Sequence, residues 1–259
     1  MKKSVLNFIS LLMVAATVFS LVSCGKTTPE NPDGEEPITS KSTTQIPVEI
    51  VDIPTDKGEL VKMLNSAIEY VELYCYRYTK RAVCKVDGLN VGTLSTVSNA
   101  EQAFRSIFGQ KDVSIEYEYN TSRDSFAANF PQSGYTVNEV SSITAQQDDG
   151  TIILTAEFPS ENNPSDKSGQ LHKLSNDYLS VENVNKALTE FNSSAASVSV
   201  TASDIKIKAT INAKDSSLQS LEVSFTQRFN LTGVTLVKIE GSGVTGASHT
   251  TVIYSSIGV

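Results

Sequence analysis

Ile205-Lys206-Ile207-Lys208-Ala209-Thr210-Ile211 is the stretch that decides the fold of this chain. Apolar and polar residues alternate through it, which is the pattern of a β-strand with one face in a core and the other in water. The polar segment Lys214-Asp215-Ser216-Ser217 follows and predicts a turn. We therefore expect an antiparallel sheet with one buried face, built around this strand.

Further strands are expected on both sides of this segment, because short alternating stretches separated by turn residues recur along the chain. Asp148-Asp149-Gly150 is a strong turn signal and predicts a hairpin. Gly241-Ser242-Gly243 is a predicted turn between two later strands. The expected strands cover residues 83–91, 113–119, 137–147, 151–158, 198–200, 205–211, 221–231, 234–240 and 249–255.

Amphipathic helices are expected between some of these strands, at residues 56–78, 99–108 and 180–191. The first is the clearest, since Asp56 and Glu59 fit a capping box and apolar residues follow at helical spacing. Arg77, Lys80 and Arg81 then fall at its C-terminal end, where cations complement the helix dipole.

These elements predict an α+β fold: a curved, half-barrel-like antiparallel sheet with amphipathic helices packed on one face. A single domain is expected at residues 47–259. The order of helix then strands occurs twice, so an alternative is two helix-plus-meander units at 47–160 and 170–259. No residue-level repeat supports a duplication.

The N-terminus has the layout of a secretion signal. Lys2 and Lys3 precede the mostly apolar run 5–22, which ends at a small residue and a cysteine. A run of this length also raises the question of a membrane-spanning helix, but Asn7, Ser10 and Ser20 interrupt it. We therefore expect residues 1–23 to be a cleaved signal peptide.

Leu21-Val22-Ser23-Cys24 resembles the lipobox of bacterial lipoproteins. The resemblance implies cleavage before Cys24 and a diacylglycerol on its thiol, which would anchor the chain to the extracytoplasmic face of the cell membrane. The alternative is an ordinary signal peptide that contains a cysteine. Residues 24–46 follow as a polar tether with almost no apolar side chain, and we expect them to be disordered.

The charge of the chain excludes some partners. Removing Lys2 and Lys3 with the signal changes the formal net charge from −8 to about −10. Such an acidic chain is repelled by phosphate backbones, so we expect no nucleic-acid partner. Contact with the membrane would then depend on the lipid at Cys24.

Two cysteines remain in the mature chain besides Cys24. Cys75 and Cys84 are a candidate disulfide, because an even pair in an exported protein is often oxidised. The alternative is a pair of buried thiols that pack as small apolar groups.

Sequence motifs for catalysis are absent. The two histidines, His172 and His249, are far apart in sequence and lie in positions typical of the surface. The sequence has no Cys/His cluster, nucleophile elbow, phosphate-binding loop or calcium loop. We therefore expect no metal site, no cofactor and no enzymatic activity.

Most of the mature chain is similar in pattern to lipoproteins of unknown function from Clostridia-type bacteria. The similarity covers the lipobox, the helix of 60–78 and the closing segments Ile205–Ile211, Leu218–Leu221 and Val252–Tyr254. The layout also resembles, more distantly, the LolA/LppX-like lipoprotein carriers. That resemblance implies a half-barrel whose apolar cavity holds acyl chains, and it is an analogy at the level of the fold.

Two functional hypotheses follow. The first is a non-catalytic binding module for a lipid or other apolar ligand, with a cavity lined by Phe104, Phe108, Tyr117 or Phe225. The alternative is a structural or protein-interaction lipoprotein that contacts another envelope protein. A filled core and a patch of exposed apolar side chains would favour the alternative.

Overall fold

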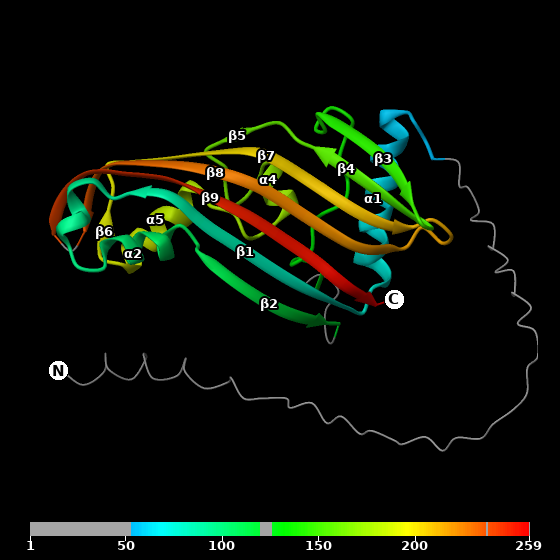
Figure 1. Cartoon of the computed structure of the whole chain (residues 1–259), viewed down its shortest axis with the longest axis horizontal. Coiled ribbons are helices and arrows are strands. Elements are labelled where there is room, and N and C mark those ends of the chain that lie inside the picture. Colours follow the sequence, from blue (N-terminus) through cyan, green and yellow to red (C-terminus); the bar gives the residue numbers. More distant parts are fainter. Residues whose placement is uncertain (1–52, 120–125, 237, 259) are drawn as a thin grey trace, which may run out of the picture. The chain divides into compact units, whose positions relative to one another are not determined.

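Nine β-strands form one open antiparallel sheet in the structure, a computed structural model that describes residues 53–119, 126–236 and 238–258. The order across the sheet is β2-β1-β9-β8-β7-β4-β3 (Figure 1), and the short strands β5 and β6 pair with β7 and β8. The strands are β1 (Arg77–Asn90), β2 (Lys111–Glu118), β3 (Ser142–Asp148), β4 (Thr151–Glu157), β5 (Glu161–Asn162), β6 (Ser193–Ser194), β7 (Ser197–Asn212), β8 (Leu218–Leu236) and β9 (Ile239–Gly258).

The predicted α+β class is confirmed, and the alternating segment lies in the middle of the sheet as part of β7. Ile205, Ile207 and Ile211 are buried, whereas Lys206 and Lys208 point to solvent. The hairpin across Asp148-Asp149-Gly150 is also confirmed, since β3 and β4 pair from Ser142↔Glu157 to Asp148↔Thr151.

Helices cover the buried face of the sheet, which explains why each strand has one polar side. They are α1 (Lys57–Tyr74), the 3₁₀ helix η1 (Gly92–Thr96), α2 (Ala100–Ile107), α4 (Gln170–Leu174) and α5 (Val181–Glu190). Asp56 caps α1, because its Oδ1 accepts hydrogen bonds from the backbone nitrogens of Gly58 (2.8 Å) and Glu59 (3.1 Å).

Two separate apolar clusters fill the space between helices and sheet. The first is centred on α1, and the second on η1, α2 and α5. Strand β8 shows that both lie on the same face, since its residues at every second position supply Phe225 to the first cluster and Phe229 to the second. Figure 1 shows α1 near one end of the sheet and α2 with α5 near the other.

Gln227 marks the border between the two clusters. It lies on β8 between Phe225 and Phe229 and is fully buried. Its side-chain amide accepts from the backbone nitrogen of Leu179 (2.7 Å) and donates to the carbonyl oxygen of Leu179 (2.8 Å). The buried amide is therefore satisfied and ties the segment before α5 to the sheet.

The first helix is shorter than predicted. It ends at Tyr74, because Cys75 has extended backbone angles (φ −67°, ψ 137°) and β1 begins at Arg77. The prediction that Arg77, Lys80 and Arg81 complement the helix dipole is therefore wrong, since all three lie on β1. Alternate residues from 78 to 86 are buried along β1, so the two-residue period prevails over the helical one.

The predicted turn at Gly241-Ser242-Gly243 is also wrong, because these residues belong to β9 and pair with β8. Gly241 is needed here because of packing. A Cβ atom on Gly241 would lie 2.5 Å from Cγ of Leu94, so the glycine makes room for η1 to lie against the sheet.

Strands from both halves considered in the sequence, 47–160 and 170–259, join this one sheet. β1 and β2 form one edge, β3 and β4 form the other, and β7 to β9 connect them. The predicted signal peptide 1–23, the tether 24–46 and the lipidation site Cys24 lie outside the described residues.

Candidate functional site

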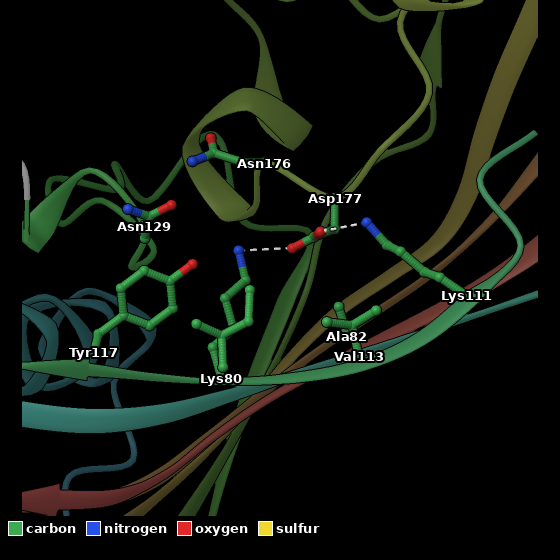
Figure 2. A pocket seen from close by; sticks show the side chains of 9 residues that line it. Lys80, Ala82, Lys111, Val113, Tyr117, Asn129, Asn176 and Asp177 are labelled. Carbon is green, nitrogen blue, oxygen red and sulfur yellow. Dashed lines mark hydrogen bonds and ion pairs between the residues drawn. The ribbon is translucent and has the colours of Figure 1, made fainter. Parts of the chain in front are cut away.

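A pocket of about 200 Å³ opens between the β1–β2 edge of the sheet and the segment that follows α4. Figure 2 shows its side chains converging from these elements. The lining residues are Lys80, Ala82, Lys111, Val113, Ile115, Tyr117, Asn129, Asn176 and Asp177.

The register of β1 and β2 explains why these side chains meet. Lys80 lies opposite Ile115 and Ala82 opposite Val113, and directly opposed residues of an antiparallel pair share a face. Lys111 is four residues before Ile115 on β2 and therefore projects to the same side. The apolar wall and both lysines thus come from one surface.

Asp177 holds the two lysines together. Its Oδ2 lies 2.6 Å from Nζ of Lys80, and its Oδ1 lies 2.6 Å from Nζ of Lys111. The side chains of Lys80 and Asp177 are only 7% and 13% exposed, whereas that of Lys111 is 36% exposed. Lys80 is therefore the enclosed member of this ion centre, and Lys111 is the member that solvent reaches.

The ion centre has one cation in excess. Burial acts to raise the pKa of Asp177, but the hydrogen bonds and positive charges of Lys111 and Lys80 outweigh it and hold that pKa below its ordinary value. Asp177 is therefore ionised at neutral pH, and the centre has two positive charges and one negative charge. Nζ of Lys80 also lies 5.8 Å from the ring centroid of Tyr254, a favourable position for a cation.

Neutral polar groups complete the pocket. Figure 2 shows the side chains of Tyr117, Asn129 and Asn176 around the ammonium group of Lys80. The Asn176 side chain is fixed by the hydrogen bond that its Nδ2 donates to the carbonyl oxygen of Ala128 (2.7 Å). Burial, and then the charge of Asp177, raises the pKa of Tyr117, so its hydroxyl stays protonated.

The arrangement suits binding of an anion that has an apolar part. A negatively charged group near Lys111 would meet the excess positive charge, and the remainder of the ligand would contact Val113 and Ile115. Within the ranges that the structure describes, no three His, Cys, Asp or Glu side chains are placed to hold a metal ion.

The four residues expected to line an apolar cavity are not brought together. Phe104 and Phe108 are fully buried in the second cluster, where Phe108 stacks on Phe229 with ring centroids 3.5 Å apart. Phe225 is buried in the first cluster, and Tyr117 lines the pocket at the β2 edge. The phenylalanines therefore serve packing, and only Tyr117 lies at the candidate site.

Cys75 and Cys84 are both buried, and no disulfide joins them. The thiol of Cys75 donates to the carbonyl oxygen of Arg77 (2.9 Å), at the start of β1. Cys84 is seven residues further along that strand, or about 23 Å at 3.3 Å per residue. A disulfide needs Cα atoms within about 7 Å, so the structure favours the alternative of buried thiols.

Sequence reasoning missed the ion centre. Lys80 was assigned to a helix end, although its place between the buried residues Tyr78 and Ala82 is a signal for an inward-facing lysine on a strand. Asp177 lies in a connector between α4 and α5 and has no periodic pattern around it. Nothing in the sequence indicates that this carboxylate reaches β1 and β2.

A scan against protein-family models finds no match, and neither a search of curated proteins nor one of solved structures finds a match to this chain. The two family resemblances inferred from sequence therefore stay predictions. Among the helices of the described ranges, none is both long and apolar enough to cross a membrane.

Proposed function

We propose that this chain is a non-catalytic, membrane-anchored binding protein of the extracytoplasmic side, which holds a small ligand with an apolar body and one anionic group. The anchor in this proposal is the lipid predicted on Cys24. The ligand site is the pocket at the β2 edge.

The ion centre carries the proposal. Two lysines share one carboxylate, so the pocket has a positive charge that no residue of its lining neutralises. The chain has a formal net charge of −8, so this half-enclosed positive site has a charge opposite in sign to that of the whole chain. Such a site favours an anionic group, and its partial enclosure strengthens the attraction relative to open water.

The size of the pocket narrows the ligand class. A volume of about 200 Å³ is below the range of about 300–1,000 Å³ typical of sites for drug-sized ligands. Phe104, Phe108 and Phe225 are buried in the two clusters beneath the sheet and do not line this pocket. The geometry therefore favours a short amphipathic anion, such as a carboxylate with a small hydrocarbon part, over a complete diacyl lipid.

Calorimetric titration of the purified chain with hexanoate, hexyl phosphate and hexanol tests this proposal. We expect both anions to bind and hexanol, which has the same hydrocarbon part without the charge, to bind at least tenfold more weakly. Comparing the two anions also shows whether the site prefers a carboxylate or a phosphate. Equal binding of hexanol and hexanoate would exclude an anion site.

A pair of lysine variants provides the matched control. Lys111→Met removes the accessible cation of the pocket, and we expect hexanoate affinity to fall at least tenfold. Lys85→Met removes an exposed lysine from the adjacent strand β1, outside the pocket lining, and should leave the affinity unchanged. An equal effect of the two variants would indicate general charge attraction instead of a site.

A further inference from the structure

Strand β2 is the outermost strand at one edge of the sheet. It pairs with β1 on one side, and no described residue pairs with it on the other. Its side chains are largely uncovered, with Val113 44% and Ile115 46% exposed. An edge strand of this kind presents unpaired backbone N–H and C=O groups next to apolar side chains, which is a template for a further strand.

The two faces of β2 differ in chemistry. Val113, Ile115 and Tyr117 lie on the inner face, beside the pocket. The outer face has Asp112, Ser114, Glu116 and Glu118, and all four are exposed. Arg81 neutralises Asp112 through two hydrogen bonds of 3.0 and 2.9 Å.

Glu116 and Glu118 lie on this outer face, and Arg77 of β1 is directly opposite Glu118. Among the described residues, no cation forms an ion pair with either carboxylate. A strand laid along β2 would place its own alternate side chains next to these two groups and next to Val113 and Ile115. The edge therefore selects for basic side chains on one face and apolar side chains on the other.

We propose that β2 binds an extended segment of a partner protein as an added strand, and that this segment alternates basic and apolar side chains. Backbone hydrogen bonds along the edge would supply affinity, as in other cases of strand addition. Glu116 and Glu118 would select the basic side chains. The uncovered parts of Val113 and Ile115 would be buried by the apolar ones.

A second copy of this chain fits the edge poorly. Two β2 strands paired symmetrically around Tyr117 would place Glu116 opposite Glu118, and pairing around Glu116 would place the two Glu116 carboxylates opposite each other. Like charges directly opposite each other destabilise a strand pair. In these registers the acidic face disfavours self-pairing, whereas a basic strand would meet opposite charge.

Strand β3 at the other edge of the sheet, taken from a second copy, is also a poor partner for β2. The outer face of β3 has Ser142, Thr144, Gln146 and Asp148, so it offers no cation to Glu116 and Glu118. Pairing of β2 with β3 of another copy would also leave one unpaired strand at each end of the assembly. Further copies could then add at both ends without forming a closed oligomer.

This interaction goes beyond the proposed ligand site: the two share Val113 and Ile115, but strand addition also uses the backbone edge of β2 and its outer face. Glu116 and Glu118 lie on the face of β2 opposite to the pocket, so changing them leaves the pocket lining intact. The alternative function considered from the sequence, contact with another envelope protein, is the setting in which such a partner segment would occur.

The test is fluorescence anisotropy of labelled, end-blocked octapeptides titrated with the full chain in a mild detergent. The first peptide alternates lysine and valine, and we expect saturable binding. The second alternates glutamate and valine, and we expect at least tenfold weaker binding. The third is the lysine–valine peptide with all its backbone nitrogens methylated, which removes every backbone donor without changing charge, and it should also bind at least tenfold more weakly.

Charge-reversal variants locate the binding. The double variant Glu116→Lys with Glu118→Lys should bind the lysine–valine peptide at least tenfold more weakly. The control Glu69→Lys with Glu190→Lys makes the same change of net charge at two exposed helical positions and should leave binding unchanged. Circular dichroism checks that both double variants are folded.

Three results would overturn the proposal. One is the absence of saturable binding up to 1 mM peptide. Another is equal binding of the N-methylated peptide, which would show that no strand is added. The third is equal weakening by the two double variants, which would show that net charge alone attracts the peptide.

Discussion

The two edges of the sheet differ in how far their inner side chains are covered. At β3, the inner residue Ile143 is only 9% exposed and belongs to the cluster beneath α1. At β2, Val113 and Ile115 occupy the inner face but remain 44% and 46% exposed. One edge is therefore covered by a helix, and the other is left open beside a pocket.

The difference lies in what holds each edge. α1 packs its apolar stripe against β3, so that edge is stabilised by removal of apolar surface from water. At the β2 edge, Asp177 draws Lys80 and Lys111 together across the pocket. An ion centre holds two strands without covering the side chains beside it, and this leaves apolar surface available for binding.

The largest expected effect is at the β3 edge. Leu64 on α1 is fully buried in the first cluster, and we expect Leu64→Ala to lower the free energy of unfolding by about 2–5 kcal/mol. Urea denaturation measures this change. Lys62→Ala, at an exposed position of the same helix, should stay within about 0.5 kcal/mol of the native chain. Similar losses for the two variants would contradict the role assigned to α1.

Breaking the ion centre should have the next largest effect. Asp177→Ala leaves Lys80 enclosed without its counter-charge, and we expect a loss of about 3 kcal/mol in the free energy of unfolding. Adding Lys80→Met removes the orphaned charge and should recover part of that loss, which a double-mutant cycle measures. If Lys80→Met makes the Asp177→Ala chain still less stable, the charges are not the cause.

A matched pair of isoleucines compares the edges directly. Ile143→Ser on β3 should lower the free energy of unfolding by about 2 kcal/mol, because the site is buried. Ile115→Ser on β2 should change it by about 0.5 kcal/mol or less, because the site is nearly half exposed. Thermal denaturation of both variants under the same conditions makes the comparison. Equal losses would mean that β2 is covered in solution.

The smallest effect is a dependence on pH at the β2 edge. The pKa of Asp177 is lower in the folded chain than in the unfolded one, so its ionised form contributes stability above the unfolded pKa of about 4. That contribution is lost as pH falls through the lowered folded pKa. The difference in unfolding free energy between the native chain and Asp177→Asn should therefore shrink between pH 7 and pH 3.

Urea denaturation at both pH values checks this prediction. Glu139 beside Lys173 also has a lowered pKa, but it is present in both proteins and cancels in the comparison. A difference that stays constant with pH would show that the Asp177 carboxylate does not titrate as the geometry implies.

Periodicity along the chain predicted most of the sheet. Ile205 to Ile211 alternate strictly, and the structure places them in the central strand β7. The same reasoning failed at residues 75–81, where helical and two-residue spacings overlap and only the pairing of β1 with β9 and β2 decides between them. It also failed at Gly241, where the need for a glycine comes from Leu94, far away in sequence.

The candidate site was beyond sequence reasoning for a physical reason. Lys80, Lys111 and Asp177 are separated by 31 and 66 residues, and only the fold brings them together. Phe104, Phe108 and Phe225 were correctly expected to face inward, whereas Tyr117 is only partly buried. Apolar periodicity does not distinguish a filled core from a hollow one.

Gln227 has a consequence for how the domain loses its structure. Because the two clusters meet at this residue, the ends of the domain share the strands β7, β8 and β9 but have separate side-chain packing. Cooperativity between the ends therefore depends on the backbone ladder and on the clamp between Gln227 and Leu179. Native-state amide exchange should resolve two subglobal openings, one for each cluster. Removing the two hydrogen bonds between Gln227 and Leu179 should increase the difference between the free energies of these openings.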